Sequence, residues 1–378
     1  MRIAFYAPLN PPDGPTPSGD RLIGRMLMQA LRADGHEVAV ASRFRTFDRM
    51  GDAVRQARIA GLGARLAMRF LRRRKASPPD LWLTYHLYHK APDHIGPIVA
   101  RGFGIPYVVV EASVTPDAAQ GPWSEGYKHV IRALGDADLV IGINPKDRLG
   151  VVPHLGPDAR YAETAVFIDG AAYRTASGNR EAHRTTLQTA TGAPAGSALL
   201  LAVGMMRSKD KLDSIRLLAE ALRQTRRTDW HLGIAGDGPL EHEAIAAFAT
   251  LKEHVTFLGR IAYERLPALY AAADLLVWPA IKEALGMCFL ESQAAGTPVI
   301  GARREGVSSI IRDGITGLLP AYGDASAFAR AIDELLVDRG RLETMRPAAA
   351  ANALERHDLT TAGRRFAALV TTARRPSR

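Results

Sequence analysis

The stretch WPAIKEALGMCFLESQAAGTPVI, residues 278–300, decides the fold class. An apolar strand ends at Trp278, a polar loop carries Glu283, and a helix that bears Glu291 leads to a second apolar strand. Strand, helix and strand in this order form the repeating unit of a parallel sheet. Ligands of such sheets bind beyond the carboxyl ends of the strands, where the free N–H groups of a helix start receive phosphate. We therefore expect both glutamates at one edge of a ligand site.

The same alternation of apolar strands and amphipathic helices extends outward in both directions and forms two series. The first series ends at a strand expected over Thr164–Phe167, and the second runs from residue 199 to 320. Between them, residues 171–197 are polar and have no sustained period, which predicts a connector with at most one short helix. The pattern predicts an α/β protein with a first domain at residues 1–172, a second at 195–352, and a C-terminal helix at 353–378.

Composition narrows the class of protein. The 378 residues are 47% hydrophobic and 23% charged, and no apolar run approaches the roughly 18 residues that a membrane span needs. The N-terminus, MRIAFYAPLN, passes straight into a strand without the pattern of a signal peptide, so we expect a cytoplasmic protein. The single cysteine, Cys288, excludes an internal disulfide and a thiolate metal cluster, and it is expected in the core.

These motifs resemble the retaining glycosyltransferases of family 4, which have the GT-B fold of two Rossmann-like domains facing each other across a cleft. The resemblance covers nearly the whole chain and is strongest over residues 199–319. It implies that the C-terminal helix returns to the first domain. In the family, two glutamates separated by seven residues mark the donor site, as Glu283 and Glu291 do here. The resemblance implies that Glu283 binds hydroxyls of the transferred sugar and Glu291 those of the ribose, with Gly286 and Met287 at the helix start beside them. Carboxylates suit this task because each offers several acceptor sites to a diol.

The diphosphate contacts depart from the family pattern. Relatives have an arginine directly after the glycine that ends the first strand of the second domain, and a lysine five positions later. Here Met205 and Met206 follow that glycine, so Arg207 and Lys211 are the candidates for the pair, with Lys209 as a substitute. Two cations would stabilise the departing phosphate without a metal ion. The resemblance thus predicts no metal and no cofactor besides the nucleotide sugar.

Further donor and acceptor residues are implied by the resemblance alone. In the family, two segments of the second domain border the nucleotide: the turn after its second strand and the chain after its third strand. The resemblance therefore implies that Gly238, Arg260 and Ile261 lie near the nucleotide. In the first domain, a loop facing the diphosphate and acceptor nominates Ser18 and Gly19, with serine where relatives have a glycine.

The acceptor side carries a second departure. Many relatives end the strand at residues 107–111 with a histidine that touches the donor sugar, whereas this chain has Glu111. His86 and His89 follow the preceding strand and can border the same cleft. Glu111 could bind a hydroxyl, act as a base, or belong to a buried structural network. Retention in the family is described as a front-face reaction in which the leaving phosphate takes the acceptor proton, so no base is assigned.

The net charge of +10 has one main source. Residues 53–75 contain eight basic residues and no acidic one: Arg55, Arg58, Arg65, Arg69, Arg72, Arg73, Arg74 and Lys75. Apolar residues at helical spacing form one face of the same segment: Val54, Ile59, Leu62, Leu66 and Phe70. A basic amphipathic helix can lie on an anionic membrane surface. The alternative is a helix that packs its apolar face on the first domain, although Gly61 and Gly63 weaken it.

The sequence therefore predicts a retaining, metal-independent glycosyltransferase that moves a sugar from a nucleoside diphosphate sugar to a hydroxyl acceptor, of the lipid-linked or cell-surface polysaccharide class. The nucleobase, the sugar and the acceptor are left open. Three alternatives remain: a catalytically silent protein that binds nucleotide sugar, an NAD-dependent oxidoreductase, and a nucleic-acid-binding protein. The absence of a G-x-G-x-x-G motif argues against the second. The basic residues are expected on a single helix and not in a groove with interleaved aromatic residues, which argues against the nucleic-acid-binding protein.

Overall fold

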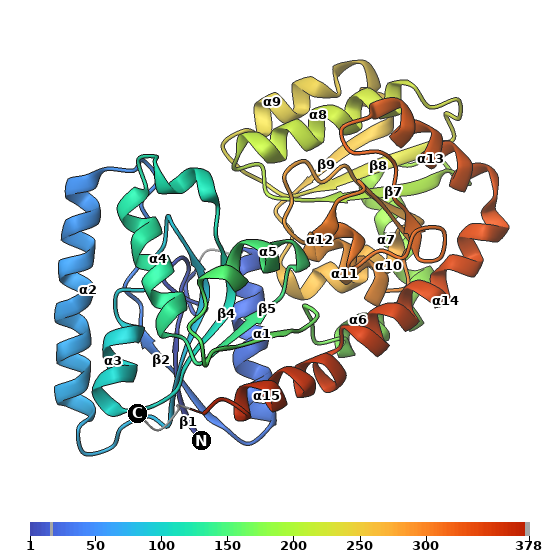
Figure 1. The fold of residues 1–378 in the computed structure, drawn as a ribbon. Helices are drawn as coiled ribbons and strands as arrows, with labels where there is room; N and C mark the ends of the chain where they lie inside the picture. The colour runs from blue at the N-terminus through green and yellow to red at the C-terminus, as the bar shows by residue number, and fades with distance from the viewer. Residues whose placement is uncertain (16–17, 375–378) are drawn as a thin grey trace. The chain divides into compact units, whose positions relative to one another are not determined.

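The computed structural model describes residues 1–15 and 18–374, and the chain divides into two compact units (Figure 1). Unit 1 comprises the residues up to Phe167 and those from Leu359 onward, and unit 2 comprises Ile168–Asp358. The chain thus leaves unit 1, builds all of unit 2, and returns.

Unit 1 is built on a parallel sheet of six strands in the order β2-β1-β3-β4-β5-β6. Its strands are β1 (Arg2–Tyr6), β2 (Glu37–Ser42), β3 (Leu81–Tyr88), β4 (Tyr107–Ser113), β5 (Leu139–Gly142) and β6 (Arg160–Glu163). The helices between them are α1 (Gly19–Ala33), α2 (Ala53–Arg74), α3 (Gly96–Phe103), α4 (Ser124–Asp136) and α5 (Arg148–Val151). The central strands are buried on both faces, as expected of a sheet covered by helices.

The last strand of unit 1 lies four residues earlier than the sequence pattern predicts. The paired residues are Arg160–Glu163, whereas Val166 and Phe167 of the predicted strand are buried outside the sheet. Phe167 packs against Phe366, with ring centres 5.9 Å apart. The apolar run was therefore a signal of packing against a helix, while the true strand lies at the sheet edge and is partly exposed.

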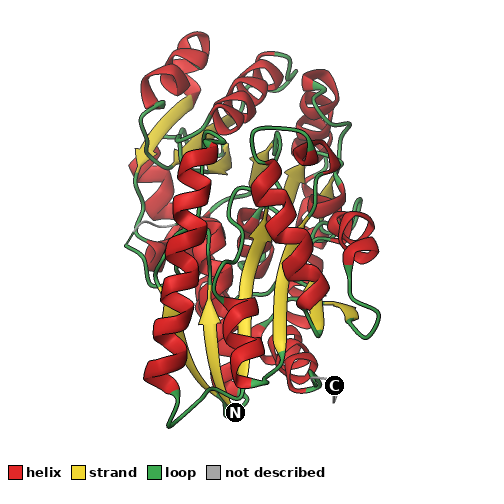
Figure 2. Ribbon diagram, turned by 60° about the vertical axis from the view of Figure 1, so that its left-hand side comes forward, coloured by secondary structure: helices red, strands yellow, loops and turns green. Residues whose placement is uncertain are grey.

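Unit 2 contains a second parallel sheet of six strands, in the order β12-β11-β10-β7-β8-β9. Its strands are β7 (Ala198–Val203), β8 (Trp230–Ala235), β9 (Val255–Gly259), β10 (Leu275–Trp278), β11 (Val299–Gly301) and β12 (Gly317–Leu318). The helices are α6 (Ala171–Gly178), α7 (Arg180–Thr191), α8 (Lys209–Arg223), α9 (Glu241–Ala247), α10 (Leu266–Ala272), α11 (Met287–Ala294), α12 (Glu305–Ser308), α13 (Ala325–Val337) and α14 (Arg339–Arg356). Figure 2 shows strands lying between layers of helices.

The prediction of a connector over residues 171–197 is wrong, because the two helices α6 and α7 occupy most of these residues. Only Leu187 and Thr191 of α7 are buried, so the helix has no broad apolar stripe. Its threonines instead return hydrogen bonds to carbonyls one turn earlier, as Thr185 does to Glu181. A helix that buries so little apolar surface leaves almost no periodic signal in the sequence.

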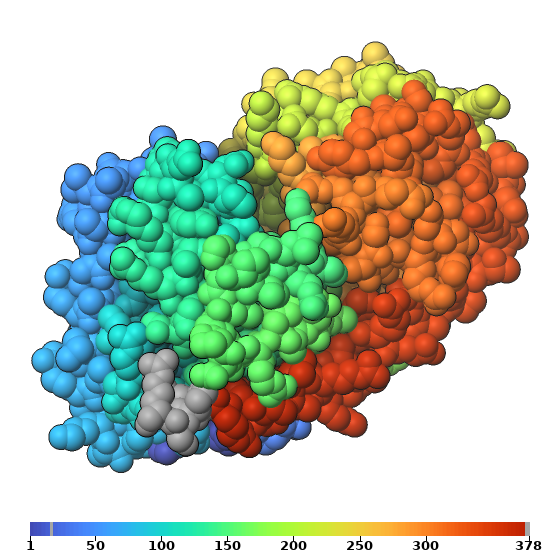
Figure 3. Space-filling model, in the orientation of Figure 1, coloured from blue at the N-terminus to red at the C-terminus, as the bar shows by residue number. Residues whose placement is uncertain are grey.

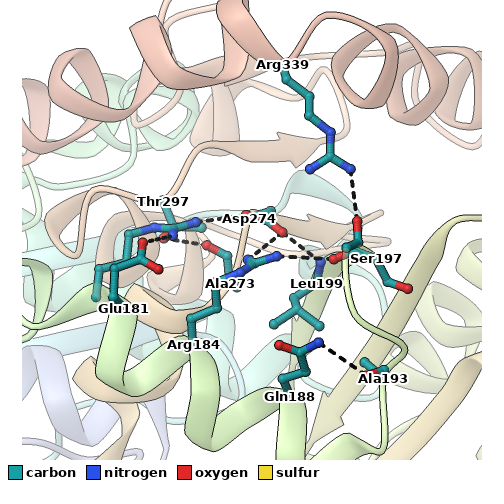
Figure 4. Close-up of polar contacts among 12 residues, drawn as sticks. Glu181, Arg184, Gln188, Ala193, Ser197, Leu199, Ala273, Asp274, Thr297 and Arg339 are labelled. Atoms are coloured by element: carbon teal, nitrogen blue, oxygen red, sulfur yellow. Dashed lines mark hydrogen bonds and ion pairs between the residues drawn. The ribbon is translucent and has the colours of Figure 1, made fainter.

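A buried carboxylate connects α7 and α14 to the sheet of unit 2. Asp274, directly before β10, accepts hydrogen bonds from Arg184 at 2.7 Å and Arg180 at 2.8 Å, and Figure 4 shows Arg184 reaching it from α7. The Leu199 N–H donates to the same carboxylate at 2.8 Å, and Arg346 of α14 lies 3.2 Å from it. Burial alone would raise the pKa of Asp274, but its arginine and N–H partners outweigh this and lower it. The start of β10 is thereby fixed.

The last helix, α15 (Arg364–Thr371), belongs to unit 1. It packs against α1 and Phe167, and Figure 3 shows the red end of the chain against green residues of that unit. Arg160 at the edge of the sheet donates to the Thr372 hydroxyl at 3.1 Å, which fastens the end of this helix.

Helix α2 forms over the predicted residues, and part of its predicted apolar face packs on the domain: Leu66 and Phe70 are half-buried against the core, with the Phe70 ring centre 5.4 Å from that of Trp82. Gln56, Gly63 and Ala67 are buried, whereas Val54 and Leu62 are 72% and 39% exposed. A Cβ at position 63 would lie 2.4 Å from Cβ of His94, so the glycine lets the helix approach the domain closely. Among the described residues, the helices are all too short or too polar to cross a membrane.

Candidate functional site

The loops that follow the strands of unit 2 gather most of the predicted donor residues at one edge of its sheet. Parallel strands end at the same edge, and β7, β8, β10 and β11 are close neighbours in the strand order. Gly236 and Gly238 after β8 have φ of 142° and 156°. A Cβ on them would lie 2.0 Å from the Gly204 carbonyl oxygen and 2.4 Å from that of Met206. Both glycines therefore allow this turn to pack directly on the loop after β7.

The predicted sugar and diphosphate residues contact each other. The Lys211 ammonium, in the first turn of α8, forms an ion pair with the Glu283 carboxylate in the loop after β10. The two side chains are 31% and 21% exposed, and the Lys211 Nζ lies 5.4 Å from the ring centre of Trp278. The pair holds one carboxylate and one ammonium half-exposed at the strand ends, where a ligand can reach both.

The start of α11 requires a glycine. Gly286 has φ of 76°, and a Cβ there would lie 2.6 Å from the Phe289 ring. Met287, the first residue of the helix, is 9% exposed, and its neighbour Cys288 is half-buried and not fully within the core as predicted. The left-handed turn brings the loop that carries Glu283 directly onto the helix that carries Glu291.

Glu291 has a different environment from Glu283. It is 5% exposed, and its carboxylate accepts a hydrogen bond of 2.7 Å from the hydroxyl of Tyr270 on α10. Burial raises the pKa of Glu291 to about 7, although the hydrogen bond from Tyr270 and the nearby Tyr173 hydroxyl oppose the rise. At neutral pH this carboxyl is therefore poised between its two protonation states, and a ligand that donates hydrogen bonds would favour the charged one.

The remaining donor candidates lie around the same edge with less contact. Arg207 and Lys209 are exposed on either side of the start of α8, whereas Met206 is buried. Arg260 is exposed and Ile261 is half-buried after β9, which is the far edge strand. The structure thus brings Lys211, Glu283 and Gly286 together and leaves Arg260 on the outermost loop.

Sequence reasoning missed several polar groups at this edge. The Asp237 Oδ1 and the Trp278 Nε1 are buried without a hydrogen-bond partner among the described residues. A buried polar atom without a partner is rare and calls for an explanation such as a ligand. Asp237 lies within the predicted turn 236–240, and Trp278 ends a predicted strand, so the sequence placed both residues near the site. Nothing in the sequence indicated that their polar atoms lack a hydrogen-bond partner.

The corresponding edge of unit 1 carries a buried cluster of charges. Asp20 on α1 contacts the His86 Nδ1 through its Oδ1 at 2.5 Å, and Glu111, near the end of β4, is 8% exposed. His86 and Glu111 have φ of 63° and 59°, which non-glycine residues seldom adopt. Burial by itself would lower the pKa of His86, but the charges of Glu111 and Asp20 raise it to about 9. Burial, together with Asp20 and Asp147, raises the pKa of Glu111 despite the charge of His86.

This cluster brings together two predicted acceptor residues, His86 and Glu111, and adds Asp20, which sequence reasoning missed. The Oδ2 of Asp20 and the Oε2 of Glu111 are buried without a hydrogen-bond partner among the described residues. Ser18 instead caps α1, accepting the Arg21 N–H at 3.2 Å, and Gly19 is the first residue of that helix. The signal for Asp20 was its place beside the predicted Ser18-Gly19 loop.

A separate cavity of about 300 Å³ lies in unit 1 between α2, α4 and the segment after β3. Three of its lining residues are His89, His94 and His129, and the rings of the last two are 4.4 Å apart. Burial, and to a lesser extent the charge of His129, lower the pKa of His94 to about 3. The described residues include no group of three or more histidine, cysteine, aspartate or glutamate side chains that could hold a metal ion.

Comparison with known proteins gives the following matches. Residues 183–352 match the family model described as glycosyl transferases group 1. A D-inositol 3-phosphate glycosyltransferase of Nocardia farcinica is 30% identical over 301 residues, which are 75% of this chain and 65% of that protein. One from Salinispora tropica is 26% identical over 274 residues, 68% of this chain and 57% of the relative. The chain therefore spans less than two thirds of the length of these relatives.

A solved structure of HepE from Anabaena with UDP has a TM-score of 0.74 at 18% identity, covering 98% of this chain and 100% of the other. Sucrose-phosphate synthase of Thermosynechococcus elongatus has a TM-score of 0.75 at 19% identity, covering 98% of each chain. The two parallel six-stranded sheets and their surrounding helices match these structures in the GT-B fold.

Proposed function

Because residues 183–352 match the family model described as glycosyl transferases group 1 and the chain has the GT-B fold, we propose that it transfers a sugar from a nucleoside diphosphate sugar to a hydroxyl acceptor. We assign it to family 4, with net retention at the anomeric carbon. The observation that carries the proposal is the Lys211–Glu283 pair, a half-exposed cation and carboxylate at the ends of the unit 2 strands. A cation and a carboxylate side by side suit a ligand that bears both phosphate and hydroxyl groups.

Each donor residue takes a distinct part of the nucleotide sugar. Glu283 accepts hydrogen bonds from the sugar hydroxyls, and Glu291 accepts them from the ribose. Arg207 and Lys211 neutralise the diphosphate, with the backbone of Gly286 and Met287 beside it. The nucleobase lies near Gly238, Arg260 and Ile261, largely against the backbone.

The chemistry then rests on charge at the leaving group. As the bond to the sugar breaks, negative charge grows on the diphosphate, and Lys211 must turn from Glu283 toward it. Glu283 in turn faces the sugar as positive charge develops there. The leaving phosphate accepts the acceptor proton, so that the chain supplies no base and needs neither metal nor cofactor.

On the acceptor side, the proposal uses the cluster of Asp20, His86 and Glu111, with Ser18 and Gly19 at its rim. The unpartnered Oδ2 of Asp20 and Oε2 of Glu111 are acceptors suited to hydroxyl groups. His86, whose pKa is about 9, is held protonated at neutral pH by the two carboxylates and acts as their counter-ion. Relatives named for D-inositol 3-phosphate likewise act on a polyhydroxylated ring.

We further propose that α2 binds an anionic membrane surface, which would place a cytoplasmic enzyme on the inner face of the membrane beside a lipid-linked acceptor. Arg65, Arg69, Arg72 and Arg73 are exposed, and so are the apolar side chains of Val54 and Met68, at 72% and 50%. Exposed arginines contribute on the order of 1 kcal/mol each near an anionic surface, and exposed apolar groups add to this.

The central experiment combines binding with turnover. Thermal shifts with UDP-, ADP- and GDP-linked sugars identify the donor, and donor consumption with EDTA present tests the metal-independent leaving group. We expect stabilisation by one nucleotide series and turnover that survives chelation. Complete loss of activity in EDTA that added metal restores would contradict the account of the leaving group. Binding without any hydrolysis or transfer would favour the catalytically silent alternative, and stabilisation by NAD alone would favour the oxidoreductase.

The membrane contact is tested by vesicle sedimentation. Changing Arg65, Arg69, Arg72 and Arg73 to glutamine should reduce binding to vesicles rich in phosphatidylserine, and wild-type binding should fall as salt rises. A matched control removes four exposed arginines of unit 2, at positions 216, 223, 226 and 330. Equal loss in both variants would mean that net charge and not α2 governs binding, and no loss in the α2 variant would leave this helix as a solvated face.

A further inference from the structure

The residues after β11 lie beside the proposed sugar-binding loop. Strands β10 and β11 are parallel neighbours, and Trp278 at the end of one is paired in register with Gly301 at the end of the other. The chain therefore leaves the sheet at two adjacent points, once toward Glu283 and once toward Arg303 and Arg304.

The two arginines have different partners. Arg303 is exposed, and its Nη2 donates to the Asp313 Oδ2 at 2.6 Å. Arg304 is half-buried, and its Nη1 is buried without a hydrogen-bond partner among the described residues. A buried donor on a charged group that lacks a partner costs more free energy than any ordinary unpaired group. The side chain is therefore held ready for an acceptor that the protein itself does not supply.

Tyr322 holds Arg304 next to the loop that carries Glu283. The Arg304 guanidinium carbon lies 5.1 Å from the centre of the Tyr322 ring. The hydroxyl of the same tyrosine accepts the backbone N–H of Lys282 at 3.2 Å. One aromatic residue thus contacts both the arginine and the residue directly before Glu283.

Two neighbouring cations are already paired with carboxylates. Lys211 is paired with Glu283, and the Lys282 ammonium lies 3.2 Å from Asp210. Met205 stands where relatives have an arginine. Arg304 is therefore the cation beside the sugar loop whose buried donor still needs an acceptor.

We propose that Arg304 binds an oxyanion of the donor substrate beside Glu283, an inference that rests on the proposed function. Planar guanidinium groups bind phosphate and carboxylate with two parallel hydrogen bonds. The oxyanion has two sources on such a substrate. One source is the diphosphate, and Arg304 would then take the part of the arginine that relatives have at the position of Met205. The other source is the carboxylate of an acidic sugar such as a uronic acid.

Calorimetric titration of the full chain with UDP, UDP-glucose and UDP-glucuronic acid separates the two sources. If the diphosphate is bound, Arg304→Gln should weaken binding of all three by about ten- to a hundredfold. If a sugar carboxylate is bound, wild type should prefer UDP-glucuronic acid, and the substitution should remove only that preference. Arg304→Lys should retain part of the affinity, because the charge remains without the planar pair of donors.

Arg303→Gln is the matched control, since it removes an adjacent arginine that already has a protein partner, and it should leave all three affinities unchanged. Thermal melting checks that each variant is folded. If both glutamine variants bind all three ligands like wild type, the inference about Arg304 is wrong while the proposed function stands. If wild type binds none of the three, nor the same three ligands with adenosine or guanosine in place of uridine, the nucleotide site itself is wrong and both proposals fail together.

Discussion

Replacing Glu283 by glutamine should tighten the binding of free UDP while slowing the reaction, the reverse of what loss of an ordinary binding residue does. In the structure the Glu283 carboxylate occupies the Lys211 ammonium that the diphosphate would otherwise attract. Glutamine keeps the shape of the side chain and removes its charge. Lys211 is then released toward the phosphates at no cost in a broken ion pair.

The magnitude follows from the exposure of the pair. Charge-assisted hydrogen bonds contribute about 1.5–3 kcal/mol when buried, and exposed pairs only about 0.2–1 kcal/mol. The side chains of Lys211 and Glu283 are 31% and 21% exposed, between these cases. We therefore take about 1–2 kcal/mol, which corresponds to roughly five- to thirtyfold tighter binding of UDP. The loss of the sugar contact should lower kcat by about tenfold or more.

Isothermal titration with UDP and steady-state donor consumption measure the two effects. Asp210→Asn is the control, because this neighbouring carboxylate pairs with Lys282 and not with Lys211. It should change UDP affinity less than Glu283→Gln does. Weaker UDP binding in Glu283→Gln than in wild type would refute the reasoning, and so would an unchanged kcat.

Three further predictions follow from buried titratable groups. Because the pKa of Glu291 is raised to about 7, its carboxyl loses its proton between pH 6 and 8, and UDP affinity should rise by up to about tenfold over that range. Glu291→Gln should make UDP affinity independent of pH there, and a flat profile in wild type would exclude Glu291 from ribose binding. The pKa of His94 is lowered to about 3, below its value near 6.5 in the unfolded chain, so the unfolded chain binds one more proton between these two pH values. The free energy of unfolding should therefore fall as the pH drops from 6.5 toward 3, by about 2 kcal/mol at pH 5. Urea titrations should show a smaller fall in His94→Asn than in wild type. Asp274→Asn should destabilise unit 2 by about 3–5 kcal/mol, because it removes the buried carboxylate that pairs with the buried Arg346 and the half-buried Arg180 and Arg184. The exposed Asp313→Asn should cost under about 1 kcal/mol in the same urea unfolding experiment.

Most strands and the donor loops could be predicted from the sequence, because strands buried on both faces leave continuous apolar runs and glycines mark the turns. Elements at the margins could not be predicted in this way. The strand Arg160–Glu163 is partly exposed at an edge, and α7 buries only two side chains, so neither has a strong periodic pattern. Val54 and Leu62 share the helical spacing of Leu66 and Phe70, yet only the latter two pack against the core of the domain, beside the buried Ala67.

Within the site, the resemblance to family 4 nominated Glu283, Glu291 and Lys211, but it did not predict how they pair. The Lys211–Glu283 contact joins positions 72 residues apart, and the hydrogen bond between Tyr270 and Glu291 joins two different helices. The same holds for His86 and Asp20, which are 66 residues apart. Such contacts depend on strand order and loop conformation, which a single sequence does not carry in readable form. Arg304 was overlooked for this reason, since only its buried and unpaired nitrogen sets it apart from Arg303.

The path of the chain through the two units also orders its biosynthesis. Unit 2 is complete at Asp358, whereas α15 and the Phe366 ring that covers Phe167 come later. During translation, the part of unit 1 that is made first therefore lacks the last helix of that unit until the chain is finished, and the surface of α1 under α15 stays uncovered meanwhile. Until α15 leaves the ribosome, this uncovered surface is a place for a chaperone to bind.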